Sequence, residues 1–99
     1  MKSQPFDPAD LLDDEDYMAA YLSEALDTGD PAFIADALGV VARARGMSRI
    51  ARDTGLSRES LYRALSPAGN PELGTLLRVV GALGLRLSVT PRSPTPPPG

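Results

Sequence analysis

The chain has 99 residues and a net charge of −3, and it contains neither cysteine nor histidine. Without those residue types, disulfides, thiolate nucleophiles, imidazole bases and the usual zinc sites are excluded, so we expect no enzymatic activity, no cofactor and no metal. No apolar run approaches the roughly 20 residues of a membrane span and nothing resembles a signal peptide, so we expect a cytoplasmic protein. A chain this short buries a modest fraction of its surface, which favours a homodimer.

The charge is distributed unevenly along the chain. Residues 1–30 carry nine acids and one base, whereas residues 31–70 carry six arginines and three acids. An arginine-bearing centre suits contact with phosphates. The acidic N-terminal third either serves solubility or meets a basic protein.

The N-terminal third predicts one helix after a lead-in. Residues 1–12 contain two prolines and read as an extended segment, after which Asp13 or Asp14 can cap a helix that runs to about Asp27. Its apolar residues recur at helical spacing, and we expect that stripe to face inward. The stripe consists of Tyr17, Met18, Tyr21, Leu22, Ala25 and Leu26.

A second helix is expected from Pro31 to Gly46, because Asp30 before a proline is a favourable helix start. Arg43 and Arg45 end this helix, where their charges suit its dipole, so we assign them a mainly structural role. The residues expected to face inward are Phe33, Ile34, Ala37, Leu38, Val41 and Ala44.

Two short helices follow. The first runs from Ser48, which we expect to cap it, to Thr54, and it closes at Gly55 because glycine adopts left-handed backbone most readily. Ser57 caps the second, which spans about residues 58–65 and ends at a loop containing proline.

The C-terminal part predicts a fifth helix, a strand and a tail. The helix begins at Asn70-Pro71 and stops at Gly84, and residues 85–90 alternate as a β-strand does. A lone strand has no partner in a helical chain, so we expect it to pair with its copy in a second subunit, while proline-rich residues 91–99 are a disordered tail. The inward residues of the helix are Leu73, Leu76, Leu77, Val80 and Leu83, and the dimer contacts are Leu85, Leu87 and Val89.

The segment 47–66 has the pattern of a helix-turn-helix. Ala51 allows the helices to approach, Gly55 lies at the turn, and an apolar set clamps the helices together. That set consists of Ile50, Leu56, Leu61 and Leu65. We therefore predict an all-α, five-helix domain over residues 13–90; the alternative for segment 47–66 is an ordinary helical hairpin.

This geometry turns the start of the second short helix outward, toward a major groove. Arg58 is the main candidate for reading guanine, because a guanidinium donates two bonds to O6 and N7. Ser57 either contacts a phosphate or only caps its helix, Glu59 either accepts from cytosine or holds an arginine, and Tyr62 either bonds a phosphate or packs. The DNA-contact candidates are Ser48, Arg49, Arg52, Ser57, Arg58, Glu59, Ser60, Tyr62 and Arg63.

Several short motifs between residues 5 and 90 match a known pattern. They are segments 5–13, 21–26, 29–34, 38–39, 42–48, 55–66, 69–71 and 83–87. In these residues the chain resembles the addiction-module antidote proteins, HigA-like antitoxins of bacterial type II toxin-antitoxin systems with a lambda-repressor-like helix-turn-helix. The resemblance implies a small basic toxin of the RelE/ParE superfamily as partner, autorepression at operator DNA, and DNA contact through Ser57, Arg58, Glu59, Ser60 and Arg63.

The resemblance also gives the acidic helix a candidate purpose. Tyr17, Tyr21 and Glu24 would bind the toxin, or the tyrosines would simply pack onto the core. Two alternatives to an antitoxin stay open. One is a stand-alone transcriptional regulator without a toxin, and the other is a protein-interaction adaptor that does not bind DNA.

Overall fold

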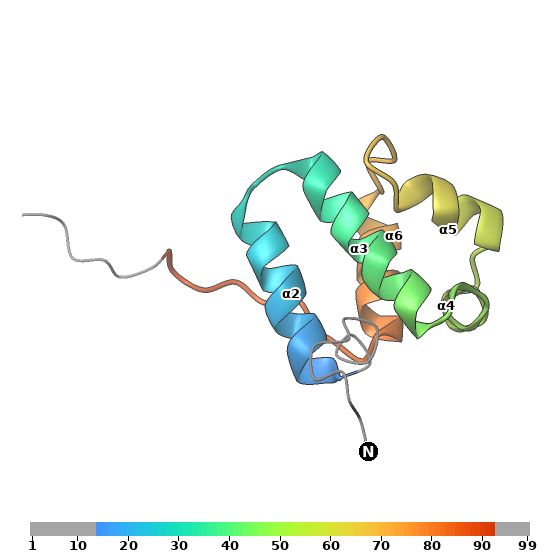
Figure 1. The fold of residues 1–99 in the computed structure, drawn as a ribbon, viewed down its shortest axis with the longest axis horizontal. Helices are drawn as coiled ribbons and strands as arrows, with labels where there is room; N and C mark the ends of the chain where they lie inside the picture. The colour runs from blue at the N-terminus through green and yellow to red at the C-terminus, as the bar shows by residue number, and fades with distance from the viewer. Residues whose placement is uncertain (1–13, 93–99) are drawn as a thin grey trace, which may run out of the picture.

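The computed structural model describes residues 14–92, and the regular secondary structure in this range is helical (Figure 1). The expected lead-in over residues 1–12 and the tail beyond Arg92 lie outside the described residues. Within residues 14–92 the chain forms five helices and no strand. The helices are α2 (Glu15–Asp27), α3 (Pro31–Arg45), α4 (Met47–Thr54), α5 (Arg58–Ala64) and α6 (Leu73–Ala82).

The first two helices begin where the sequence predicts. The Asp14 carboxylate accepts from the Asp16 amide at 2.9 Å, and the Asp30 carboxylate accepts from the Ala32 amide at 3.0 Å. Pro31 occupies the first position of α3, where a backbone N–H would have no acceptor within the helix, so proline loses no hydrogen bond there. The Asp14 cap therefore fixes the start of α2, and the Asp30 cap fixes where α3 begins after the turn.

The start of α4 corrects the expected cap. Gly46, not Ser48, precedes the helix, with φ 114°, and no side chain bonds the free amides at that end. Met47 is the first helical residue and is buried with Ile50. Gly46 precedes α4 with a backbone conformation that few other residues adopt, and the helix begins two residues earlier than a cap at Ser48 would place it.

The start of α6 is also later than expected. Asn70 has a left-handed φ of 47°, whereas the residue before a helix normally has extended backbone. Glu72, with φ −67° and ψ 157°, takes that place, and the helix begins at Leu73. The Asn70-Pro71 pair is thus part of the loop after α5.

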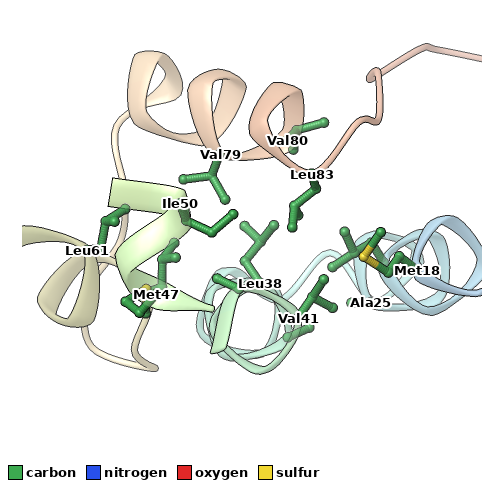
Figure 2. Packing of buried hydrophobic residues seen from close by; sticks show 14 residues of the cluster. Met18, Ala25, Leu38, Val41, Met47, Ile50, Leu61, Val79, Val80 and Leu83 are labelled. Carbon is green, nitrogen blue, oxygen red and sulfur yellow. The ribbon is translucent and has the colours of Figure 1, made fainter. Parts of the chain in front are cut away.

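Side chains from all five helices meet in one apolar core (Figure 2). Met18 of α2, Leu38 of α3, Ile50 of α4 and Leu61 of α5 are almost completely buried, as is Val79 of α6. Each such side chain contributes about 1.5–3 kcal/mol by leaving water. This shared core holds the two short helices, α4 and α5, against the longer ones.

Some residues expected in the core are exposed. The exposed fraction is 67% for Leu73, 48% for Leu77 and 52% for Phe33. Val79 of α6, which was not expected in the core, is fully buried. Helix α6 packs against α4, which turns its Val79 and Leu83 side inward. Apolar residues occur on more than one side of α6, so its packing against the other helices determines which of them are buried.

The segment after α6 forms no strand within the described residues. Leu85 and Leu87 are half-buried against the core and, with Leu22, line an apolar hollow between α2, α3 and α6, whereas Val89 is 97% exposed. A strand needs a neighbouring strand, and one copy of the chain offers none here. Pairing with a second copy therefore stays a prediction.

Candidate nucleic-acid interface

A tight corner joins α4 to α5. Gly55 has a left-handed φ of 78°, and its amide donates to the Ala51 carbonyl at 2.9 Å. The Thr54 hydroxyl donates to the Ile50 carbonyl at 2.7 Å and accepts from the Leu56 amide at 3.2 Å. Thr54 is buried and braces both sides of the corner, a role that the sequence analysis did not assign to it.

Ser57 caps α5, as its sequence position predicts. Its hydroxyl oxygen accepts from the Ser60 amide at 3.0 Å and donates to the Ser60 hydroxyl at 2.9 Å. The two serines therefore bond each other across the first turn of α5. Their hydroxyl groups stay on the exposed surface of the helix.

Helix α5 is held in place by contact with α3 and by the burial of its own apolar residues. A Cβ atom at Gly39 of α3 would collide with the carbonyl oxygen of Leu65, so the two backbones cross in close contact. Leu61 and Leu65 are buried in the core. Because the inner side of α5 is held at these points, the opposite side is the one presented to solvent.

All nine expected DNA-contact residues are exposed: Ser48, Arg49, Arg52, Ser57, Arg58, Glu59, Ser60, Tyr62 and Arg63. Besides the bonded pair Ser57 and Ser60, the structure brings Arg58 and Tyr62 together, with the Arg58 guanidinium carbon 6.0 Å from the centre of the Tyr62 ring. Tyr62 is 43% exposed, so its side chain is partly covered by the protein and partly open to solvent. A guanidinium over an aromatic face gains weak cation–π attraction, which limits where Arg58 can point.

Arg52 pairs with its neighbour, because its Nε atom lies 3.6 Å from an Asp53 carboxylate oxygen. The Arg52 side chain is still 75% exposed. An exposed pair of this kind is worth at most about 1 kcal/mol, so Arg52 can exchange Asp53 for a phosphate at little cost.

Arg45 has the structural role expected of it. Its Nη2 atom donates to the Leu83 carbonyl oxygen at 3.1 Å and lies 3.8 Å from a Glu15 carboxylate oxygen. One side chain at the end of α3 thus contacts both the end of α6 and the start of α2. Arg45 therefore does not belong to the exposed arginine set.

The three expected toxin contacts lie on α2, away from the α4–α5 corner (Figure 1). The Tyr17 and Tyr21 rings stack, with centroids 6.4 Å apart and planes 24° apart. Tyr21 is half-buried against the core, while Tyr17 and Glu24 are exposed. The tyrosines therefore combine packing with a surface position.

Charge separates along the fold. Residues 14–42 carry seven acids and no base, whereas residues 43–92 carry nine arginines and three acids. The first group covers α2 and most of α3, and the second begins at the end of α3 and includes α4 and α5 (Figure 1). We call these the acidic part and the arginine part of the molecule.

Two further findings concern the described residues alone. Between Asp14 and Arg92, no three acidic side chains come together in a group that could hold a metal ion. None of the helices in this range has the length and apolar character that a bilayer crossing requires.

Comparison with known proteins identifies the family. A model of the family described as "probable addiction module antidote protein" matches residues 2–91. A protein of Haemophilus influenzae, named only as an uncharacterized protein, is 49% identical over 84 residues, which cover 85% of this chain and 87% of that protein. No solved structure matches the chain. Because the family model spans nearly the whole sequence, the chain belongs to the addiction-module antidote family, which implies an antitoxin role and a toxin partner.

Proposed function

We propose that this antitoxin also binds operator DNA and represses its own operon, with α4, the corner at Gly55 and α5 acting as a helix-turn-helix. One observation carries the proposal: apart from the Tyr62 ring, the exposed side chains of α5 and of the adjacent surface of α4 are polar or charged, with arginines prominent, while Ile50 and Leu61 are buried. A short helix held rigidly with such a surface suits insertion into a major groove.

Within this proposal the arginines divide into two roles. Arg58, steadied by the Tyr62 ring, reads guanine through two hydrogen bonds, and Glu59 beside it accepts from a cytosine amino group. Arg49, Arg52 and Arg63 contact phosphates, which fix the register of the protein without reading sequence.

We further propose that the toxin is a small basic protein of the RelE/ParE superfamily. The acidic part of the molecule supports this proposal, because seven acids without a base attract a basic partner and repel DNA. Tyr17, Tyr21 and Glu24 are the proposed contacts, since a stacked aromatic pair beside a carboxylate offers both apolar area and charge.

The proposed repressor is a homodimer. Two copies would place their α5 helices roughly 34–36 Å apart, the spacing of successive major grooves on one side of a duplex. Residues 85–90 of the two copies are proposed to pair as strands, which would give that segment the neighbour it lacks in a single chain.

Replacing Arg58 tests the DNA-binding proposal. Arg58→Ala is expected to weaken binding to the chain's own promoter by about 5- to 150-fold, because a two-bond guanine contact is worth roughly 1–3 kcal/mol. Fluorescence anisotropy with a promoter duplex measures the change. Arg92→Ala is the matched control, since it removes an equal charge far from α5. Equal affinity of the Arg58 variant and the parent would show that Arg58 does not read DNA.

The toxin proposal is tested with the product of the adjacent gene. We expect that product to be small and basic and to co-purify with the full chain. Combining Tyr17→Ala with Glu24→Lys should abolish co-purification while promoter binding persists, because α2 and α5 lie at opposite sides of the fold (Figure 1). Absence of a toxin gene and of any toxin-like partner would favour the stand-alone regulator.

A further inference from the structure

An apolar hollow lies between α2, α3 and α6, beside the segment that follows α6 and passes α2 (Figure 1). Its lining is apolar except for Ser23 and Arg86. Leu26 is 40% exposed at its edge, and Ile34 and Leu76 are half-buried within it. Removing this apolar surface from water is favourable, so the hollow favours an apolar occupant.

The hollow has the size of a side chain. Its volume is about 100 Å³, and an apolar cavity of about 150 Å³ is enough to hold a benzene ring. Because the hollow opens to solvent beside Leu26, a ring can enter it without being completely enclosed. One large apolar side chain is therefore a suitable occupant.

Two ends of the chain lie outside the described residues and could supply that side chain. Residues 93–99 contain only proline, serine, threonine and glycine. Residues 1–13, which we call the N-terminal segment, contain Phe6, Leu11 and Leu12. The family match begins at residue 2 and ends at residue 91, so it includes this segment and not the tail. The N-terminal segment is therefore the better candidate, with Phe6 as its largest apolar side chain.

The N-terminal segment is long enough to reach the hollow. Because a helix rises 1.5 Å per residue, Leu26 lies roughly 18 Å along α2 from Asp14. Phe6 precedes Asp14 by eight residues, and an extended chain of that length spans up to about 26–29 Å. Pro5 and Pro8 beside Phe6 favour extended backbone over a helix. The chain can therefore turn back before α2 and bring Phe6 to the hollow.

Charge indicates how the segment would lie. Arg86 lines the hollow, and no acid in the part of the chain that the structure describes forms an ion pair with it. Glu24 and Asp27 lie next to lining residues on α2 and repel further acids there. An acid of the N-terminal segment is therefore favoured at the opposite rim, beside Arg86. Asp7 directly follows Phe6 and suits that position.

We propose that the N-terminal segment folds back along α2 and occupies the hollow of its own chain, with the Phe6 ring in the hollow and the Asp7 carboxylate beside Arg86. The segment then joins α2 to the residues after α6 and adds its acids to the acidic part. Tyr17 and Tyr21 do not line the hollow, so the proposed toxin contacts stay uncovered.

A spin label tests this position in the full chain, where an introduced cysteine is unique because the parent has none. A nitroxide on Gln4→Cys should broaden the NMR signals of Ser23 and Leu26 and leave that of Tyr62 on α5 sharp. Adding Phe6→Ser should abolish the broadening and leave the other signals in place. Sharp signals at the hollow in the Gln4 variant, or broadening that survives Phe6→Ser, would overturn the proposal.

Two further measurements distinguish other occupants. Broadening of Ser23 by a nitroxide on Thr95→Cys, but not by one on Gln4→Cys, would make the tail the occupant and refute the proposal. Isotope-labelled parent chains mixed with unlabelled chains carrying the Gln4 nitroxide should show no broadening. Broadening in that mixture alone would mean that the segment enters the hollow of a second copy, which contradicts a contact within one chain.

A double-mutant cycle tests the charge contact. Asp7→Asn and Arg86→Gln should each lower the ratio of docked to free segment by up to about fivefold, the range of an exposed ion pair. The combined variant should lose no more than either single variant, because the second change removes a partner that is already absent. Asp10→Asn is the matched control and should leave the ratio unaltered. Losses that multiply in the combined variant would refute the pairing.

These measurements use neither DNA nor a toxin, so they are independent of the proposed function. A docked segment in a chain that binds no promoter would support this inference and refute the repressor proposal. Promoter binding by a chain whose hollow stays open would do the reverse.

Discussion

Ser57 shows how one side chain can serve the fold and the proposed function together. Its hydroxyl is bonded to the amide and the hydroxyl of Ser60, so its capping role is fully occupied. The sequence predicts this cap because serine before a helix is a strong start signal. It does not predict that Thr54, three residues earlier, braces the same corner, since a threonine near a helix end has many possible partners.

The two roles of Ser57 can be separated. Ser57→Ala should lower the free energy of unfolding by about 1 kcal/mol, because the Ser60 amide loses its acceptor. Ser57→Asp should keep the parent stability, since aspartate caps as well, but weaken promoter binding by adding a negative charge beside phosphates. Urea unfolding and anisotropy measure the two effects. If Ser57→Asp binds promoter as the parent does, this end of α5 does not approach DNA.

Helix α5 has only seven residues and depends on its neighbours for stability. Isolated helices shorter than about 12–15 residues are marginal in water, so its position must come from packing. The crossing of α3 at Gly39 and the burial of Leu61 supply that packing. The pattern of caps predicts that the helix exists, but not which neighbour fixes its direction.

Gly39 therefore gives a prediction about α5. Gly39→Ala should lower the free energy of unfolding by about 1–3 kcal/mol, because the new methyl group must displace the Leu65 backbone. Gly55→Ala provides a comparison, since its methyl meets nothing within 4 Å and only the φ of 78° opposes it. Thermal or urea unfolding measures both. Parent stability in the Gly39 variant would mean that α3 and α5 are not in close contact.

On the scale of the molecule, the seven acids of the acidic part lie apart from most of the arginines. A single net charge of −3 conceals this separation. Two partners of opposite charge can then bind different regions of one small domain, which is the arrangement that an antitoxin with a DNA-binding role requires.

Salt dependence tests the separation. The logarithm of promoter affinity should fall linearly with the logarithm of salt concentration. Arg49→Ala should reduce the magnitude of that slope by about 0.9 if Arg49 contacts one phosphate. Asp27→Asn also changes one charge, but on α2, and should leave the slope unaltered. A response to Asp27→Asn of equal size and opposite sign would indicate that only the total charge matters.

The sequence by itself determined the helical class, the caps at Asp30 and Ser57, and the corner at Gly55, because each depends on bonds between residues close in the chain; for α2 it left Asp13 and Asp14 as alternatives. It also determined the family, through motifs spread over most of the chain. Only the tertiary structure decided that α4 begins at Met47 and that α6 buries Val79 and exposes Leu73. Those outcomes depend on how helices distant in sequence approach one another, and periodicity within one helix cannot specify the approach.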